Sequence, residues 1–110
     1  MVLVYGRVTE GITFNATETR LYVGNTGDHA ITVCSVNHKD GILTDCNLTG
    51  PVFNGFGNIA LSFNDNYAYV PNSNTNAVTK CDVDQSTGAL VNCIDSNGTG
   101  FVGAASVTLR

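Results

Sequence analysis

Residues 12–53 read ITFNATETRLYVGNTGDHAITVCSVNHKDGILTDCNLTGPVF, and residues 61–101 read LSFNDNYAYVPNSNTNAVTKCDVDQSTGALVNCIDSNGTGF, so one pattern occurs twice in this chain. Matching residues keep their order through both units, and most matches lie at a constant offset. The matches include Phe14-Asn15 with Phe63-Asn64, Tyr22-Val23 with Tyr69-Val70, Cys34 with Cys81, Gly41 with Gly88, and Cys46 with Cys93. Such ordered self-similarity is typical of repeat architectures, in which each unit is one supersecondary structure.

Each unit is predicted to contain four short strands separated by turn residues. The expected strands cover about residues 8–14, 20–24, 30–37 and 42–47, and then 57–63, 67–71, 77–84 and 89–95. No segment has the apolar spacing of a helix, so the predicted fold class is all-β. Four strands in a unit of this length fit one β-propeller blade. The chain, residues 1–110, is therefore interpreted as one propeller fragment. It has blade-like repeats at 8–50 and 57–97 and extra terminal strands within 1–6 and 102–110.

Two segments, LYVGN at Leu21–Asn25 and AYVPN at Ala68–Asn72, resemble the signature of the YVTN family of β-propeller repeats. The later turn at Thr87–Leu90 is similar to that family as well. The resemblance implies a propeller of the lactonase or surface-layer type. Complete members usually carry about seven blades, and this chain has about two to two and a half.

Composition excludes several classes of protein. The 110 residues carry 5 Lys plus Arg against 9 Asp plus Glu, a net charge of −4, so no nucleic-acid partner is expected. No apolar run approaches the length that spans a bilayer, so no membrane-spanning segment is expected. The N-terminal segment lacks the basic region and cleavage site of a secretion signal.

The four cysteines form two pairs, each in the predicted hairpin between the third and fourth strands. If Lys39–Gly41 forms a three-residue loop, Cys34 lies opposite Cys46, and the same count sets Cys81 opposite Cys93. Opposed residues on paired strands are close enough for a disulfide. Free buried thiols and a zinc site are the alternatives. Disulfides would favour an oxidising compartment, outside the cytoplasm or at the cell surface.

A ligand-binding face is predicted where the loops after the second and fourth strands gather. Short amide and hydroxyl side chains suit a carbohydrate or a peptide, because each Asn supplies a donor and an acceptor. These residues are also ordinary turn formers. The candidate ligand-binding residues are Asn25, Asp28, His29, Asn72, Asn74 and Asn76.

No catalytic residue, metal site or cofactor is predicted. The segment Asp82–Gly88 spaces oxygen ligands like a calcium loop, but Cys93 stands where a bidentate Glu would be needed. A polar hairpin turn is the simpler interpretation. His29 beside Asp28 could form an acid–base pair, although adjacent loop residues more often point apart.

The first functional hypothesis is a non-enzymatic propeller module for binding or scaffolding. The alternative is a fragment of a lactonase-like propeller enzyme, or a truncated piece of a longer surface propeller. A blade is apolar on both faces, so two blades leave two faces uncovered. We therefore expect a homo-oligomer, a dimer or a trimer, that closes into a ring.

Overall fold

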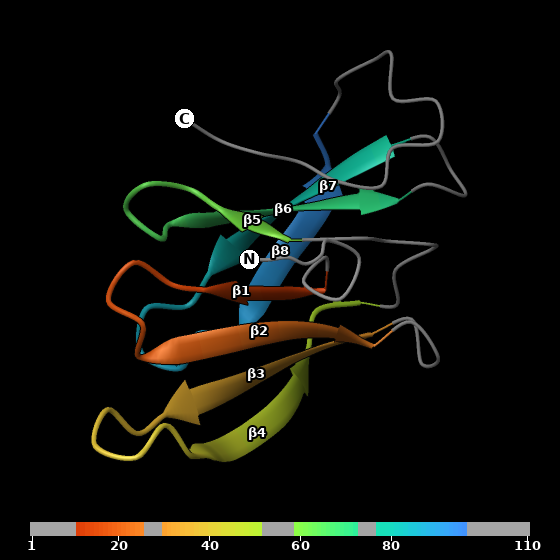
Figure 1. Ribbon diagram of the computed structural model, residues 1–110. Helices are drawn as coiled ribbons and strands as arrows, with labels where there is room; N and C mark the ends of the chain where they lie inside the picture. Colours follow the sequence, from red (N-terminus) through yellow and green to blue (C-terminus); the bar gives the residue numbers. More distant parts are fainter. Residues whose placement is uncertain (1–10, 26–29, 52–58, 73–76, 97–110) are drawn as a thin grey trace, which may run out of the picture.

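The computed structural model describes residues 11–25, 30–51, 59–72 and 77–96, which form two four-stranded antiparallel sheets (Figure 1). The first sheet, here called blade 1, has the order β1-β2-β3-β4, and blade 2 has the order β5-β6-β7-β8. Their strands are β1 (Ile12–Phe14), β2 (Arg20–Asn25), β3 (Ala30–Val36), β4 (Leu43–Thr49), β5 (Ala60–Leu61), β6 (Tyr67–Asn72), β7 (Ala77–Val83) and β8 (Leu90–Asp95). The predicted all-β class and blade-like sheets are confirmed.

The eight described strands lie close to their predicted positions, and equivalent strands of the two blades are 47 residues apart, as at Arg20 and Tyr67, where β2 and β6 begin. The chain runs up and down through each sheet, so the strands of a blade are joined by turns at alternate ends. The predicted terminal strands within 1–6 and 102–110 lie outside the described residues.

A polar side chain fixes the turn between the first two strands of each blade. In blade 1, Asn15 Oδ1 accepts the backbone N–H groups of Thr19 and Arg20, both at 2.9 Å. In blade 2, the Ser62 hydroxyl accepts the N–H of Tyr67 at 3.0 Å. Asn15 and Ser62 are therefore the structural equivalents, and both turns hold an acidic residue at positive φ, Glu18 at 59° and Asp65 at 61°.

The match of Phe14 with Phe63 is wrong. Phe14 lies in β1 and pairs with Leu21, whereas β5 ends at Leu61, which pairs with Ala68. Phe63 instead lies in the β5–β6 turn with 98% of its surface exposed. The residue equivalent to Phe14 is Leu61, because pairing with the neighbouring strand, rather than the identity of one side chain, sets the register.

Both cysteine pairs form disulfides, as predicted, with Cα–Cα distances of 4.1 Å for Cys34–Cys46 and 4.0 Å for Cys81–Cys93. The predicted three-residue loop is wrong in detail, because the Asn37 amide bonds to the Ile42 carbonyl and the turn holds four residues between them. A β-bulge then shifts the register by one residue. Asp45 at this bulge has a φ of 52°, and Asn92 has 53° in the equivalent bulge. The cysteines lie at these bulges, where the extra residue brings each pair into opposition.

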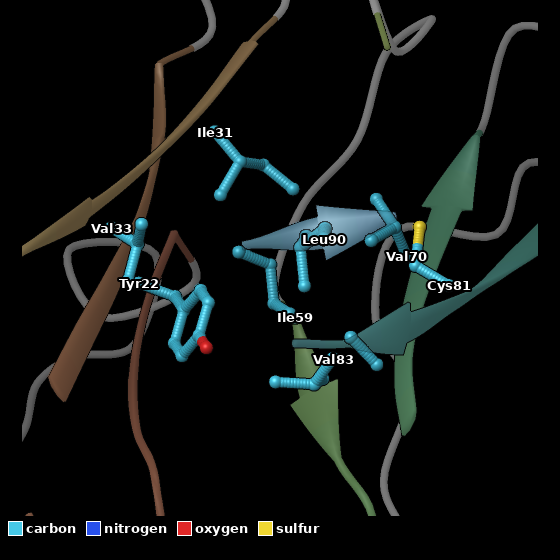
Figure 2. Close-up of a cluster of buried hydrophobic side chains, with 9 residues drawn as sticks. Tyr22, Ile31, Val33, Ile59, Val70, Cys81, Val83 and Leu90 are labelled. Carbon is cyan, nitrogen blue, oxygen red and sulfur yellow. The ribbon is translucent and has the colours of Figure 1, made fainter. Parts of the chain in front are cut away.

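The two blades share one hydrophobic core, which lies between their facing surfaces (Figure 2). Blade 1 contributes Tyr22, Ile31 and Val33. Blade 2 and the segment leading into it contribute Ile59, Ala68, Val70, Cys81, Val83 and Leu90. Side chains alternate along a strand, so one face of each blade builds this core and the other points away from it.

Candidate functional site

Two of the six predicted ligand-binding residues, Asn25 and Asn72, lie at one end of the molecule, here called the loop end, where β2 and β6 finish and β3 and β7 begin. In Figure 1 the loop end lies on the right for both blades. Asn25 pairs with Ala30, and Asn72 pairs with Ala77, so each Asn closes a hairpin at the equivalent position of its blade. The other candidates, Asp28, His29, Asn74 and Asn76, lie outside the described residues.

Asn25 has its side chain fixed by a neighbouring strand. Its Nδ2 donates to the Thr32 hydroxyl at 2.7 Å, and the side chain is half-buried. This bond uses one amide donor and leaves Oδ1 as an acceptor of known orientation. An amide held in this way can accept a hydrogen bond from a ligand hydroxyl without first losing rotamer freedom.

The opposite end of the molecule, here called the turn end, consists of the turns 15–19, 37–42, 62–66 and 84–89 and lies on the left in Figure 1. Asp84 Oδ1 accepts the Ser86 hydroxyl at 2.6 Å and its amide at 2.8 Å. These bonds lower the pKa of Asp84. The carboxylate therefore holds the turn together, as expected of a polar hairpin turn.

Asp82, the other acid of the calcium-like segment, faces away from this turn. Lys80 Nζ lies 3.2 Å from its Oδ1, and Asn92 Nδ2 donates to its Oδ2 at 3.2 Å. The hydrogen bond from Lys80, followed by that from Asn92, lowers the pKa of Asp82. Within the four described ranges, no group of three or more His, Cys, Asp or Glu residues is arranged to hold a metal ion.

A seam of hydrogen bonds joins the blades, and sequence reasoning did not single out its residues as functional. The buried Tyr22 hydroxyl donates to the Gly88 carbonyl at 2.6 Å, and the Leu90 amide donates to the Thr49 hydroxyl at 2.7 Å. Nearer the turn end, the Ala16 amide donates to the Asp65 carboxylate at 3.0 Å. Arg20 Nη2 donates to the Gln85 carbonyl at 3.2 Å.

The signal for this seam was present in the repeat. Tyr22 and Gly88 each recur at the equivalent position of the other blade, as Tyr69 and Gly41. A phenol repeated beside apolar neighbours indicates a buried ring with a fixed partner for its hydroxyl. Burial raises the pKa of Tyr22 to about 12, which is consistent with a hydroxyl kept neutral between the blades.

Comparison with known proteins supports the propeller architecture. No protein-family model and no curated protein sequence matches this chain. Among solved structures, the chain is similar to the periplasmic gluconolactonase PpgL of Pseudomonas aeruginosa. That match has a TM-score of 0.69 and 18% identity, and it covers 89% of this chain and 26% of the other.

A second solved structure is a protein of Bacteroides fragilis assigned as a 6-phosphogluconolactonase. It matches with a TM-score of 0.60 and 26% identity, over 83% of this chain and 25% of the other. The chain thus spans about a quarter of the length of these solved structures. Both matches extend over more than one blade, so the arrangement of the two sheets, as well as each sheet alone, is shared.

No described segment forms a helix long and apolar enough to cross a membrane.

Proposed function

We propose that this chain supplies two adjacent blades of a lactonase-type β-propeller whose loop end binds a sugar lactone. The observation that carries the proposal is the likeness to the Bacteroides fragilis structure, which spans both blades at 26% identity. It favours the lactonase alternative over the non-enzymatic module for binding or scaffolding. The resemblance of Leu21–Asn25 and Ala68–Asn72 to YVTN repeats points to the same broad class of propeller.

The chemistry of the loop end suits such a ligand. A sugar lactone carries a ring of hydroxyl groups and an ester carbonyl, which call for paired donors and acceptors. Asn25 presents an oriented amide oxygen there, and Asn72 closes the equivalent hairpin of blade 2. Asp28 and His29 follow Asn25 in the sequence, and Asn74 and Asn76 follow Asn72, so the sequence supplies here the residue types that bind hydroxyl groups.

The two disulfides support a location outside the cytoplasm. Disulfides persist where the environment is oxidising and are rare in cytosolic proteins. An extracytoplasmic propeller of this kind would meet free sugar lactones rather than the phosphorylated intermediates of the cytosol. We therefore rank glucono-δ-lactone ahead of its 6-phosphate as the substrate to test.

The test is a lactone hydrolysis assay with the purified protein in its assembled state. Proton release from glucono-δ-lactone and from its 6-phosphate is followed after subtraction of the spontaneous rate. We expect hydrolysis above that rate, and a loss of at least about tenfold when Asn25, Asp28, Asn72 and Asn74 are together replaced by Ala. A matched control carries Thr17→Ala and Lys39→Ala at the turn end and should keep the wild-type rate.

The outcomes separate the two functional hypotheses. Folded, assembled protein that gives no hydrolysis of either lactone would overturn the enzymatic proposal. Binding of gluconate or another sugar without turnover, abolished by the same four substitutions, would instead favour the non-enzymatic module. Far-ultraviolet circular dichroism of every variant distinguishes loss of function from loss of fold.

A further inference from the structure

Each blade has one face that the shared core leaves uncovered. The open face of blade 1 points away from blade 2 and includes Ile12, Phe14, Leu43 and Leu48, which are 41% to 67% exposed, and Leu21 and Cys34, which are buried. The open face of blade 2 includes Tyr67, Tyr69, Lys80, Val91 and Ile94, together with Pro71 and Val78, which are buried. Residues paired across antiparallel strands share a face, so the registers assign these sets.

Exposure shows that the open face of blade 1 is built to be covered. The residues of blade 2 that correspond in the repeat to this open face form the face that packs against blade 1. There, Ile59 is 2% exposed and Leu90 is 3% exposed, whereas their equivalents Ile12 and Leu43 are 45% and 41% exposed. The same type of apolar residue therefore occupies both positions, covered in one blade and uncovered in the other.

The tyrosine of the seam recurs together with its acceptor. Tyr22 donates to the Gly88 carbonyl, and the equivalents of these residues are Tyr69 on the open face of blade 2 and Gly41 at the edge of the open face of blade 1. Both glycines have positive φ, at 75° and 82°. A Cβ built on Gly88 would lie 2.5 Å from Arg20 Cδ and 3.1 Å from the Tyr22 hydroxyl, whereas one on Gly41 meets nothing within 4 Å.

Two of the three remaining polar contacts of the seam show the same correspondence. The bond from Arg20 to the Gln85 carbonyl does not, because Tyr67 stands in the place of Arg20. Asp65 accepts the Ala16 amide, and Glu18 is the equivalent acid on blade 1, with the Phe63 amide as the equivalent donor on blade 2. Thr49 accepts the Leu90 amide. The equivalent of Thr49 is Ser96, which also carries a hydroxyl. The Ser96 amide bonds to the Val78 carbonyl, so Ser96 lies beside β7 as Thr49 lies beside β3.

We propose that the open face of blade 2 docks onto the open face of blade 1 of a second copy of this chain and repeats the contact between blades 1 and 2. Tyr69 would then donate to Gly41, the Phe63 amide to Glu18, and the Leu43 amide to Ser96 of the adjoining copy. This contact is head-to-tail, so successive copies close into a ring when the rotation fits. The inference is independent of any lactone, because a ring that binds none would assemble in the same way.

A position in the core also departs from the pattern. Lys80 occupies the place of Val33, which packs in the core between the blades. Its ammonium lies 3.2 Å from the Asp82 carboxylate and 4.4 Å from the centroid of the Tyr67 ring. The charge is thus paired on its own blade, and the aliphatic stem of Lys80 can take the packing role of Val33.

The test is light scattering coupled to size exclusion at micromolar concentrations of the whole chain. Wild type should elute as a closed oligomer. Asn tolerates positive φ, so Gly41→Asn should keep the turn, but its side chain would fill the space that Tyr69 of the adjoining copy occupies. We expect the dissociation constant of the oligomer to rise at least about tenfold. Tyr69→Phe removes only the hydroxyl and should weaken assembly less. Lys39→Ala, in the same turn as Gly41, is the matched control and should assemble like wild type.

Disulfide protection gives a second measurement on the same samples. Cys46 is exposed on the open face of blade 1, so the docked copy should slow reduction of Cys34–Cys46, and Gly41→Asn should restore fast reduction. A wild-type monomer at micromolar concentration would overturn the proposal and would leave the open faces to further blades of other sequence. An oligomer unchanged by both Gly41→Asn and Tyr69→Phe would also overturn it.

Discussion

Tyr22 connects the two blades through one oxygen atom. Its side chain is 1% exposed, and its hydroxyl donates to the Gly88 carbonyl at 2.6 Å. Desolvation by burial is the largest cause that raises its pKa to about 12, and the Asp65 carboxylate adds to it against the opposing effect of Arg20. A phenolate in this position would lose its hydration and its donor role together.

We predict that Tyr22 makes the protein sensitive to alkaline pH. In the unfolded chain the phenol ionises near its ordinary pKa of 10.0, whereas in the folded protein the pKa is raised to about 12 and the proton is held until then. The folded state therefore binds more protons in this window, and the free energy of unfolding falls as pH rises. The slope should be roughly 1.4 kcal/mol per pH unit between about 10 and 12.

Urea unfolding of wild type and Tyr22→Phe across that range measures this contribution. Tyr22→Phe should lose about 1 kcal/mol at neutral pH, because the buried Gly88 carbonyl loses its donor, and should show a shallower alkaline decline. Thiol exchange does not complicate the comparison, since all four cysteines are in disulfides. Parallel alkaline slopes for the two proteins would contradict the assignment.

At the scale of the element, the β3–β4 and β7–β8 hairpins are two versions of one design. Each has a turn closed by a glycine at positive φ, a bulge that contains a polar residue, and a disulfide at the bulge. Their surroundings differ. Cys81 is fully buried in the core between the blades, whereas Cys46 is exposed on the open face of blade 1.

This difference predicts the order in which the disulfides are reduced. In dispersed chains, for example those of Gly41→Asn, a limiting amount of dithiothreitol should open Cys34–Cys46 before Cys81–Cys93. Attack requires access of a thiolate to a sulfur atom. Alkylation of the released thiols followed by peptide mapping identifies the pair. Each short closed loop should contribute at most about 3 kcal/mol, so the fold should survive loss of the first disulfide. Release of Cys81 and Cys93 first would contradict the packing described here.

The sequence alone predicted the strands and both disulfides, because the repeat exposes alternation and turn residues in duplicate. It could not predict the bulges at Asp45 and Asn92, since counting back from an assumed turn allows no extra residue. The misplacement of Phe63 has a similar cause, because an apolar letter does not reveal where pairing stops. At the loop end, the sequence placed Asn25 in the loop after the second strand, whereas it is the last residue of β2 and pairs with Ala30, because strand pairing continues one residue further than the turn residues indicate.

At the scale of the whole molecule, the core lies between the sheets and not within either one. Tyr22 and Ile31 are buried by blade 2, and Ile59 and Leu90 are buried against blade 1. A sheet of four strands cannot bury its apolar faces alone. Each blade therefore depends on its neighbours for stability, and the two open faces need further neighbours to cover them.

We predict that the midpoint of thermal unfolding rises with protein concentration. Contacts between copies stabilise the folded state by mass action, whereas a monomer unfolds at a temperature independent of concentration. Scanning calorimetry of wild type over a wide range of concentrations measures the effect. Gly41→Asn should show a much weaker dependence, and a constant midpoint for wild type would contradict the prediction.

The bulges of β4 and β8 have a further consequence for solubility. Among the described residues, β4 and β8 are each the last strand of their sheet, so one side of each pairs with no other described strand. Such an edge is a template for strand addition and for fibril growth, and a bulge interrupts the regular spacing that an incoming strand requires. Asp45 and Asn92 place a twisted, polar backbone in the middle of these edges. The bulges therefore protect the β4 and β8 edges against amyloid-like growth, while association through the apolar faces stays open to the molecule.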